Sequence, residues 1–363
     1  MKRLKIRRYL YRIITDQNFS FTANLIKFFL FFISFLYFLF IKLILFLYDI
    51  RLLRKKTFNN VLIVSIGNIT WGGTGKTPLV GSIARYFKEK GKNVVILSRG
   101  YTMRKNPEAI SDETFMLSQK LTNIPIIVSP SRRKGIIEAK EKYGADIVLL
   151  DDGFQQWGIK KDLEIVVIDG INPFGNGWLI PRGILREPIS SLKRADIFII
   201  NKVDMVEDKS KLKNLDDRLK KINPRAQIFN AIYLPQYLQS LTDGKKKDFG
   251  IIKDKDVCAF CGIASPQYFK FIVEKVGGSV KLFFEFLDHY FYEEKDLLNI
   301  FSSCLRQGID ILITTEKDAV RLLPFLDIIR KNFNKLSLFS LVIEPRILES
   351  DIFYARLFNI HNS

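Results

Sequence analysis

The sequence predicts an α/β fold with a parallel sheet, and two features of the chain predict it. After residue 57, short apolar runs alternate with stretches of helical character, and a glycine-rich turn separates the first run from an amphipathic helix. Unbroken apolar runs are typical of strands that are buried on both faces, and strands joined by helices pair in parallel. The predicted strands lie in NNVLIV, NVVILSRG, IPIIVSP, ADIVLLDDG, LEIVVIDG and ADIFIINKVD.

The first 60 residues form a basic and strongly apolar segment. The chain has a formal net charge of +19, and these residues contain twelve Lys or Arg against two Asp. Residues 28–48 are apolar apart from one serine, two tyrosines and Lys42, and as a helix they would span about 30 Å, which matches a bilayer core. Basic residues on both sides favour an anionic membrane surface as the partner, and no nucleic acid is expected because the chain carries no recognition motif for it. A buried helix of a soluble domain is the alternative.

Residues 65–80, SIGNITWGGTGKTPLV, have the layout of a P-loop, in which a strand and a glycine-rich turn precede a helix. Glycines allow backbone N–H groups to surround an anion, and the helix N-terminus adds a positive dipole end. Lys76 would reach the outer phosphates of a nucleotide, and the Thr77 hydroxyl would bind Mg²⁺. Thr70 stands where the strict pattern has its first glycine, and an ordinary glycine turn is the alternative. The expected phosphate-binding residues are Thr70, Trp71, Gly72, Gly73, Thr74, Gly75, Lys76 and Thr77.

Polar side chains follow the predicted strands at their carboxyl ends, where ligands of parallel sheets collect. IVLLDDGFQ predicts a Walker B element in which Asp151 and Asp152 lie near Mg²⁺. Residues 201–204 read NKVD, which is also the guanine-reading pattern of GTPases, so a membrane-associated P-loop GTPase is an alternative function. A non-enzymatic membrane anchor that binds nucleotide structurally is a second alternative. The strand-end residues are Arg99, Asp151, Asp152, Asp169 and residues 201–204.

The character of the chain changes after about residue 216, from alternating strands and helices to charged helix and short loops. QIFNAIYLP and LSLFSLVIEP predict two strands that bracket a second block of strands and helices. We therefore expect a P-loop domain and a second, smaller α/β domain joined by a two-stranded linker. The expected boundaries are 1–56 for the basic N-terminus and membrane-associated helix, 57–225 for the P-loop domain, 226–235 and 337–347 for the linker strands, 236–336 for the second domain and 348–363 for a C-terminal tail.

Three cysteines are too few for a disulfide scaffold. Cys258 and Cys261 form a C-x-x-C motif, and a redox pair or a zinc site with His289 and Cys304 is conceivable. Small core residues at the end of a strand are the favoured interpretation.

Seven motifs in order resemble the tetraacyldisaccharide 4'-kinase family of lipid A biosynthesis, and the hydrophobic N-terminus also matches. A threonine at the position of Thr70 is normal in that family. The resemblance implies ATP and Mg²⁺ as cofactors, and transfer of the γ-phosphate to the 4'-hydroxyl of an acylated glucosamine disaccharide 1-phosphate lipid to give lipid IVA. It also implies a location at the inner membrane, with the catalytic domains on the cytoplasmic face. The motifs are GNITWGGTGKTP, SRGY, DDGFQ, PRGILREP, AFCGIASPQYF, LDHYF and TTEKDAVRL.

The resemblance also implies which residues act. Asp112 would help to activate the acceptor hydroxyl, and His289 would pair with it from the second domain. From the residues alone, Asp112 is a carboxylate at a helix N-terminus and His289 is a packed core histidine. Asp151 and Asp152 would serve Mg²⁺ and the acceptor pocket. The residues implied as catalytic are Asp112, His289, Lys76, Asp152, Arg186 and Glu187.

Two positions depart from the family pattern. Gln156 follows DDGFQ, where the family usually has histidine, and Tyr290 follows His289, where a second histidine is frequent. Secondary roles at these two positions are therefore open.

Overall fold

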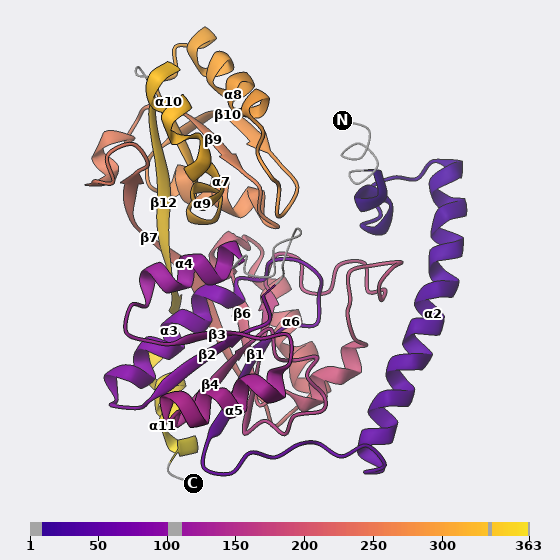
Figure 1. The fold of residues 1–363 in the computed structure, drawn as a ribbon. Helices are drawn as coiled ribbons and strands as arrows, with labels where there is room; N and C mark the ends of the chain where they lie inside the picture. The colour runs from indigo at the N-terminus through magenta and orange to yellow at the C-terminus, as the bar shows by residue number, and fades with distance from the viewer. Residues whose placement is uncertain (1–8, 101–110, 333–335, 362–363) are drawn as a thin grey trace. The chain divides into compact units, whose positions relative to one another are not determined.

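The computed structural model describes residues 9–100, 111–332 and 336–361, and its contacts divide the chain into two compact units (Figure 1). Unit 1 consists of Met1–Tyr101, Leu121–Ile232 and Ile347–Ser363, and unit 2 consists of Thr102–Lys120 and Tyr233–Arg346. The basic residues before position 9 and Tyr101 of the SRGY motif lie outside the described residues. Among the described residues, 111–120 belong to unit 2, whereas the sequence placed them in the first domain.

Unit 1 is built on a parallel sheet, as predicted. Its strands lie in the order β7-β6-β5-β1-β4-β2-β3, and neighbouring strands in this order pair in parallel. Strands β2, β4 and β6 are buried along their whole length, which explains their unbroken apolar sequences. The strands are β1 Leu62–Gly67, β2 Val94–Ser98, β3 Ile126–Val128, β4 Ile147–Asp151, β5 Leu163–Asp169, β6 Ile197–Asn201 and β7 Gln227–Ser240, of which β7 belongs to unit 1 up to Ile232 and to unit 2 from Tyr233.

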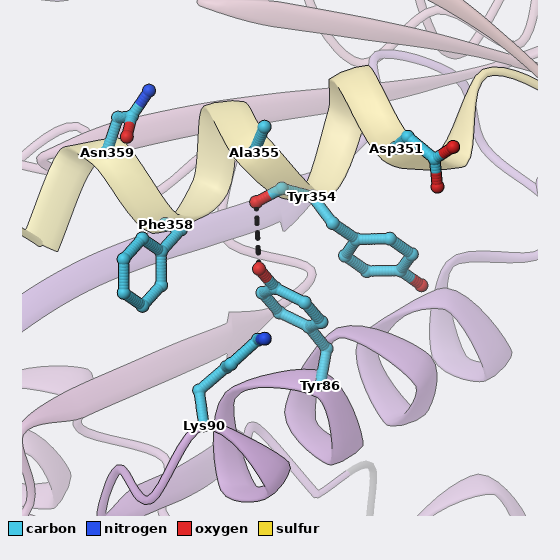
Figure 2. Close-up of a pocket in the computed structure, with 7 residues that line it drawn as sticks. All are labelled: Tyr86, Lys90, Asp351, Tyr354, Ala355, Phe358 and Asn359. Carbon is cyan, nitrogen blue, oxygen red and sulfur yellow. Dashed lines mark hydrogen bonds between the residues drawn. The ribbon is translucent and has the colours of Figure 1, made fainter.

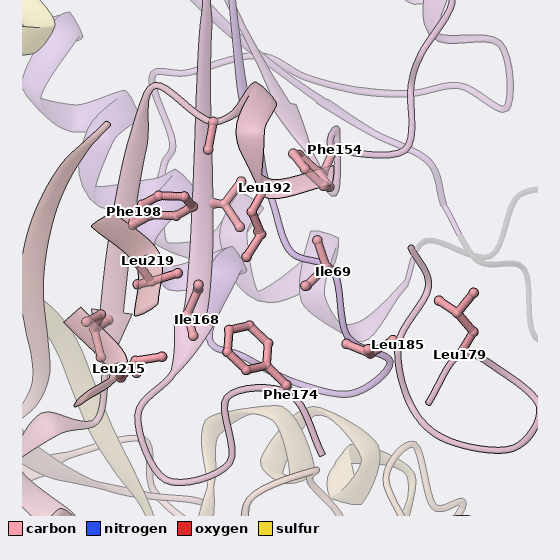
Figure 3. Close-up of a cluster of buried hydrophobic side chains, with 13 residues drawn as sticks. Ile69, Phe154, Ile168, Phe174, Leu179, Leu185, Leu192, Phe198, Leu215 and Leu219 are labelled. Carbon is pink, nitrogen blue, oxygen red and sulfur yellow. The ribbon is translucent and has the colours of Figure 1, made fainter. Parts of the chain in front are cut away.

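Helices cover the sheet of unit 1 and complete its cores. Helix α3 packs on β1, β2 and β4, and α5 packs on β2 and β3. Helix α6 supplies Leu215 and Leu219 to a buried cluster around Phe198, which also contains Ile69 and Leu185 (Figure 3). The segment after β1 and the PRGILREP motif therefore share one core. The elements are α2 Phe21–Asp49, α3 Lys76–Glu89, α5 Arg132–Tyr143, α6 Lys209–Ile222 and α11 Ser350–His361, with the 3-10 helices η1 Ile189–Arg194 and η2 Val203–Met205.

Helix α2 docks on unit 1 through a stripe that holds polar side chains. Ser34 Oγ donates to the Leu179 carbonyl at 2.9 Å, and Tyr37 OH donates to the Arg186 carbonyl at 3.0 Å. Tyr37 and Phe38 also pack against the cluster of Figure 3. The stripe therefore satisfies carbonyl groups of the segment that leads into PRGILREP.

The remaining faces of α2 are apolar and exposed. By length and composition the helix could cross a membrane, since its most apolar window has a mean hydropathy of 2.6 and is only 11% buried. Exposed apolar patches of this extent mark interaction surfaces in soluble proteins. The exposed large apolar side chains are Phe21, Leu25, Phe28, Phe29, Phe31, Phe32, Ile33, Phe35, Leu36, Leu39, Phe40, Leu43 and Phe46.

Residues 350–361, expected as part of a C-terminal tail, form helix α11 instead. Tyr86 of α3 donates its hydroxyl hydrogen to the Tyr354 carbonyl at 3.1 Å, and the two rings stack with centroids 4.3 Å apart (Figure 2). Ser82 and Tyr354 are also hydrogen-bonded through their hydroxyls. A shallow pocket lined by Lys90, Asp351 and Phe358 lies beside this contact. The aromatic packing holds the end of the chain on the helix that follows the P-loop.

The main strands of unit 2 lie in the order β10-β9-β11-β12, and neighbouring strands in this order pair in parallel. All three cysteines are fully buried, and Cys258 and Cys304 belong to its core cluster. Among the described residues, no group of three or more His, Cys, Asp or Glu could hold a metal ion. The elements are α4 Asp112–Lys120, β8 Lys246–Lys247, η3 Phe249–Ile251, β9 Asp256–Cys261, α7 Pro266–Lys275, β10 Ser279–Glu285, α8 Glu294–Arg306, β11 Ile311–Thr315, α9 Glu316–Leu322, η4 Leu323–Phe325, α10 Leu326–Asn332 and β12 Ser337–Ile347.

Ion pairs explain why α4 belongs to unit 2. Helix α4 packs on α9, and its acidic first turn faces the basic residues of α9. Arg321 Nε lies 2.7 Å from Asp112 Oδ2, and Lys317 Nζ lies 2.9 Å from Glu113 Oε1. At the other end of α4, Lys120 Nζ lies 2.6 Å from a carboxylate oxygen of Glu316. Acidic residues at a helix N-terminus and a lysine at its C-terminus also suit the helix dipole.

Candidate active site

The P-loop runs from the end of β1 to the start of α3. Gly72 and Gly75 have φ values of 118° and 84°, which residues with a Cβ rarely adopt, and Gly75 is the N-cap of α3. Lys76 and Thr77 are the first two residues of the helix. The strand, turn and helix that the sequence predicted are therefore present in the predicted order.

Two other motifs pack directly against this loop. Trp71 N donates to the Ile184 carbonyl and Arg186 N donates to the Ile69 carbonyl, both at 2.6 Å, so PRGILREP pairs with the loop as a short antiparallel ribbon. A Cβ at Gly67 would lie 2.6 Å from the backbone nitrogen of Phe154 in DDGFQ, which is why a glycine ends β1. The fold thus brings three sequence motifs to one edge of the sheet.

Lys76, Asp152 and Arg186, one from each motif, meet in a single ionic network. Lys76 Nζ donates to Asn68 Oδ1 at 2.9 Å and lies 3.3 Å from Asp152 Oδ1. Arg186 donates through one terminal nitrogen to both Asp152 oxygens, at 2.9 and 2.7 Å. Asp152 has a φ of 58°, a conformation that is uncommon outside glycine and is enriched at functional sites.

The charges of this network fix the ionisation of Asp152. Burial alone would raise the pKa of its carboxyl, but Lys76 and Arg186 beside it lower that pKa to about 2. The carboxylate is therefore ionised at neutral pH. An incoming anionic group would have to share Lys76 with it.

Glu187 follows Arg186 in the chain, and its side chain is fully buried. Its carboxylate accepts hydrogen bonds from Gln155 at 3.2 Å and Trp157 at 3.0 Å. Arg194 lies 3.0 Å from its second oxygen. The resemblance implied that Glu187 is catalytic, whereas in this structure its buried carboxylate binds Gln155, Trp157 and Arg194.

Oxygen donors suitable for Mg²⁺ lie at the same edge. Thr77 is buried at the start of α3, and Asp151 ends β4, paired in register with Ile66 of β1. Mg²⁺ in nucleotide sites is held by one or two hydroxyl or carboxylate oxygens together with phosphates, so the donor set of Thr77, Asp151 and Asp152 fits this ion. Asp152 is the least available of the three, because Lys76 and Arg186 already bind it.

The structure places Asp112 and His289 together in unit 2, not in different domains as expected. It does not show the predicted pair between them. Asp112 binds Arg321, which also donates to the Gly262 carbonyl and to Asp318 Oδ1, each at 2.9 Å. The guanidinium satisfies several acceptors at once, and it holds the Asp112 carboxylate at the start of α4.

His289 has different neighbours, Lys317 and Asp288. Its Nε2 lies 3.4 Å from Lys317 Nζ and 3.8 Å from Asp288 Oδ2. Burial first, and Lys317 second, lower the pKa of His289 below its ordinary value. The imidazole is therefore neutral at pH 7, as a proton acceptor must be. Its φ of 58° is another uncommon backbone conformation.

Three residues of the site were not among the predicted ones. Asn68 accepts from Lys76, Gln155 contacts both Glu187 and Arg186, and the buried Arg132 donates to the Asp151 carbonyl at 2.6 Å. Asn68 and Gln155 lie inside recognised motifs, so a polar residue at a strand end was the available signal. Arg132 begins a helix whose sequence gives no sign of the site.

Comparisons with known proteins agree with this geometry. The family described as tetraacyldisaccharide-1-P 4'-kinase matches residues 26–360. A tetraacyldisaccharide 4'-kinase of Halothermothrix orenii is 36% identical over 88% of this chain and 89% of its own length, and that of Elusimicrobium minutum is 33% identical over 84% of each.

Among solved structures, LpxK from Aquifex aeolicus in complex with ATP is similar, with a TM-score of 0.65 and 26% identity. The match covers 91% of this chain and 97% of that one. Family match, relatives and fold agree over most of the length: the chain belongs to the tetraacyldisaccharide-1-P 4'-kinase family.

Proposed function

We propose that this protein transfers the γ-phosphate of ATP to the 4'-hydroxyl of a tetraacyldisaccharide 1-phosphate, and that the product is lipid IVA. The observation that carries the proposal is the Lys76–Asp152–Arg186 network at the P-loop. Phosphoryl transfer depends on positioning and on stabilising negative charge, and two cations beside a glycine-rich turn at a helix N-terminus are suited to both. Relatives named for this activity, and an LpxK solved with ATP, support the choice of substrates.

Lys76 is the residue that would hold the outer phosphates. Its ammonium is shared between Asn68 and Asp152, two acceptors that fix its position. A phosphate that binds Lys76 would compete with Asp152 for the ammonium. The Asp152 carboxylate would then still be hydrogen-bonded to Arg186, so it would not be left without a cation. Mg²⁺, held by Thr77 and Asp151 with a contribution from Asp152, would supply further neutralisation of phosphate charge.

The acceptor hydroxyl needs a group that can take its proton. We assign this role to Asp112, with His289 as a second proton acceptor, on the strength of the family motifs. The neutral state of His289 and the fixed position of Asp112 are compatible with these roles.

The lipid substrate also determines where the protein works. The exposed phenylalanines and leucines of α2 suit the acyl region of a bilayer, and the basic N-terminal sequence suits an anionic surface. We place the protein at the inner membrane with both units on the cytoplasmic face, where nucleotide is available.

A labelling assay tests the proposal. The full-length protein in detergent–lipid micelles receives γ-labelled ATP or GTP and a tetraacylated disaccharide 1-phosphate, with the 4'-deoxy analogue of that lipid as the matched control. We expect label on the lipid with ATP and none on the 4'-deoxy lipid. Hydrolysis of GTP without labelled lipid would favour the GTPase alternative, and absence of any turnover would favour a nucleotide-binding anchor.

A further inference from the structure

The NKVD sequence begins with Asn201, the last residue of β6, and its first two side chains contact backbone carbonyls of the P-loop. Asn201 is fully buried, and its Nδ2 donates to the Thr74 carbonyl at 2.9 Å. Lys202 is 3% exposed, and its Nζ lies 3.4 Å from the Gly73 carbonyl. Both acceptors are consecutive carbonyls of the loop that Lys76 closes.

These contacts matter because of how a P-loop binds phosphate. Its N–H groups must point towards the anion, so neighbouring carbonyls point the other way and need donors of their own. A peptide whose carbonyl is held by a buried donor cannot rotate its N–H away from the ligand. Asn201 is the closer of the two donors, at 2.9 Å, whereas the ammonium of Lys202 lies 3.4 Å from its carbonyl and acts there mainly through its charge.

Two further features preset Lys202 for this role. It forms an ion pair with Asp169 at the end of β5, which balances the buried charge. Its φ is 62°, a conformation uncommon for residues with a Cβ, and its backbone N–H donates to Asn201 Oδ1 at 2.9 Å. The backbone of the motif is thus bent so that both side chains reach the loop.

We propose that Asn201 and Lys202 are positioning residues that hold the P-loop carbonyls of Thr74 and Gly73 and so preset the loop for a polyphosphate. The motif does not select the base, although its four letters match the guanine-reading pattern. This inference rests on nucleotide binding at the P-loop, which is part of the proposed function.

Binding of inorganic tripolyphosphate distinguishes positioning of the P-loop from recognition of the base, because this ligand has no base. The full-length protein in detergent is titrated with tripolyphosphate, ATP and GTP. We expect Lys202→Met and Asn201→Ala each to weaken all three by about tenfold, with the ratio of ATP to GTP affinity unchanged. Asp204→Asn, in the third polar position of the motif, is the matched control and should change none of them.

A second pair of variants guards against loss of folding. Lys202→Met leaves Asp169 without its cation, so the double variant Lys202→Met/Asp169→Asn removes both charges, and thermal unfolding shows whether each protein is folded. We expect tripolyphosphate affinity to stay low in the double variant, because the carbonyl donor is still missing. Asp169→Asn alone keeps that donor and should retain more affinity than Lys202→Met.

Two results would overturn the inference. One is wild-type affinity for tripolyphosphate in Asn201→Ala or in the folded double variant, and the other is a loss confined to one nucleotide. A wild-type protein that bound neither ATP nor tripolyphosphate would instead refute the proposed function, so the two failures are distinguishable.

Discussion

Unit 1 and unit 2 each hold an ion-paired carboxylate, Asp152 with two cations and Asp112 with one, but the two clusters have different surroundings. Asp152 lies between Lys76 and Arg186 at a glycine-rich loop, whereas Asp112 lies on Arg321, whose other donors bind Gly262 and Asp318. In unit 1 the cations lie at a glycine-rich turn that leads into a helix N-terminus, a layout that favours anions. In unit 2 Arg321 is engaged with protein acceptors. Ion pairs alone therefore do not identify a site, and the neighbouring backbone decides what they do.

The largest effect should follow removal of the P-loop cation. Lys76→Ala should lower kcat roughly 10³-fold while the protein stays folded, because the ammonium acts where negative charge moves during transfer. Lys88→Ala, an exposed lysine in the last turn of the same helix, is the control and should stay near wild type. Turnover close to normal in folded Lys76→Ala protein would mean that the network of unit 1 has a structural role and does not act in phosphoryl transfer.

In unit 2 the corresponding cation should affect stability first. Arg321→Met should lower the free energy of unfolding by about 3 kcal/mol, because Asp318 is fully buried and would lose its cation. The midpoint of urea unfolding in detergent measures this loss, with Arg306→Met at the exposed end of α8 as the control. A stable Arg321→Met protein with impaired turnover would show that the Arg321 cluster serves the reaction directly.

The two clusters also differ in how far apart their residues lie in the sequence, and this distance determines which features could be predicted. The P-loop is local, so spacing alone predicted the strand, the glycine turn and the helix that begins at Lys76. The parallel strands were predictable because burial on both faces leaves unbroken apolar runs. These features depend on residues that are close in sequence.

Long-range partners were not predictable in the same way. Asp112 belongs to unit 2 because of Arg321, 209 residues later in the chain, and nothing in ISDETF indicates that partner. The family resemblance implied a catalytic role for Glu187, but its side chain is buried against Trp157 and Arg194, which its own motif does not contain. Motif resemblance identifies residues that belong to a site without giving the direction of each side chain.

A smaller effect would show whether the network of unit 1 depends on α2. Tyr37→Phe removes the donor to the Arg186 carbonyl and should cost about 1 kcal/mol of stability, the usual value of one such hydrogen bond. Tyr48→Phe on the same helix is the control, since no hydrogen bond to its hydroxyl is found among the described residues. Thermal unfolding of both variants in detergent gives the comparison, and equal midpoints would mean that α2 contributes only apolar contact.

The smallest effect concerns the protonation of His289. Lys317→Met removes a cation that lies 3.4 Å from Nε2 of His289. Loss of this positive charge favours the imidazolium, so the pKa of His289 should rise towards its ordinary value. The sequence has two histidines, so NMR titration in a His361→Gln background follows one imidazole. The lowered pKa means that the unfolded chain binds a proton more readily than the folded one. Stability should therefore fall as pH drops from about 6.5 towards the pKa of folded His289, and this fall should be shallower in Lys317→Met. An unchanged titration would show that burial alone sets the pKa, and that the cation of α9 acts on Glu113 and Asp288 but not on the histidine.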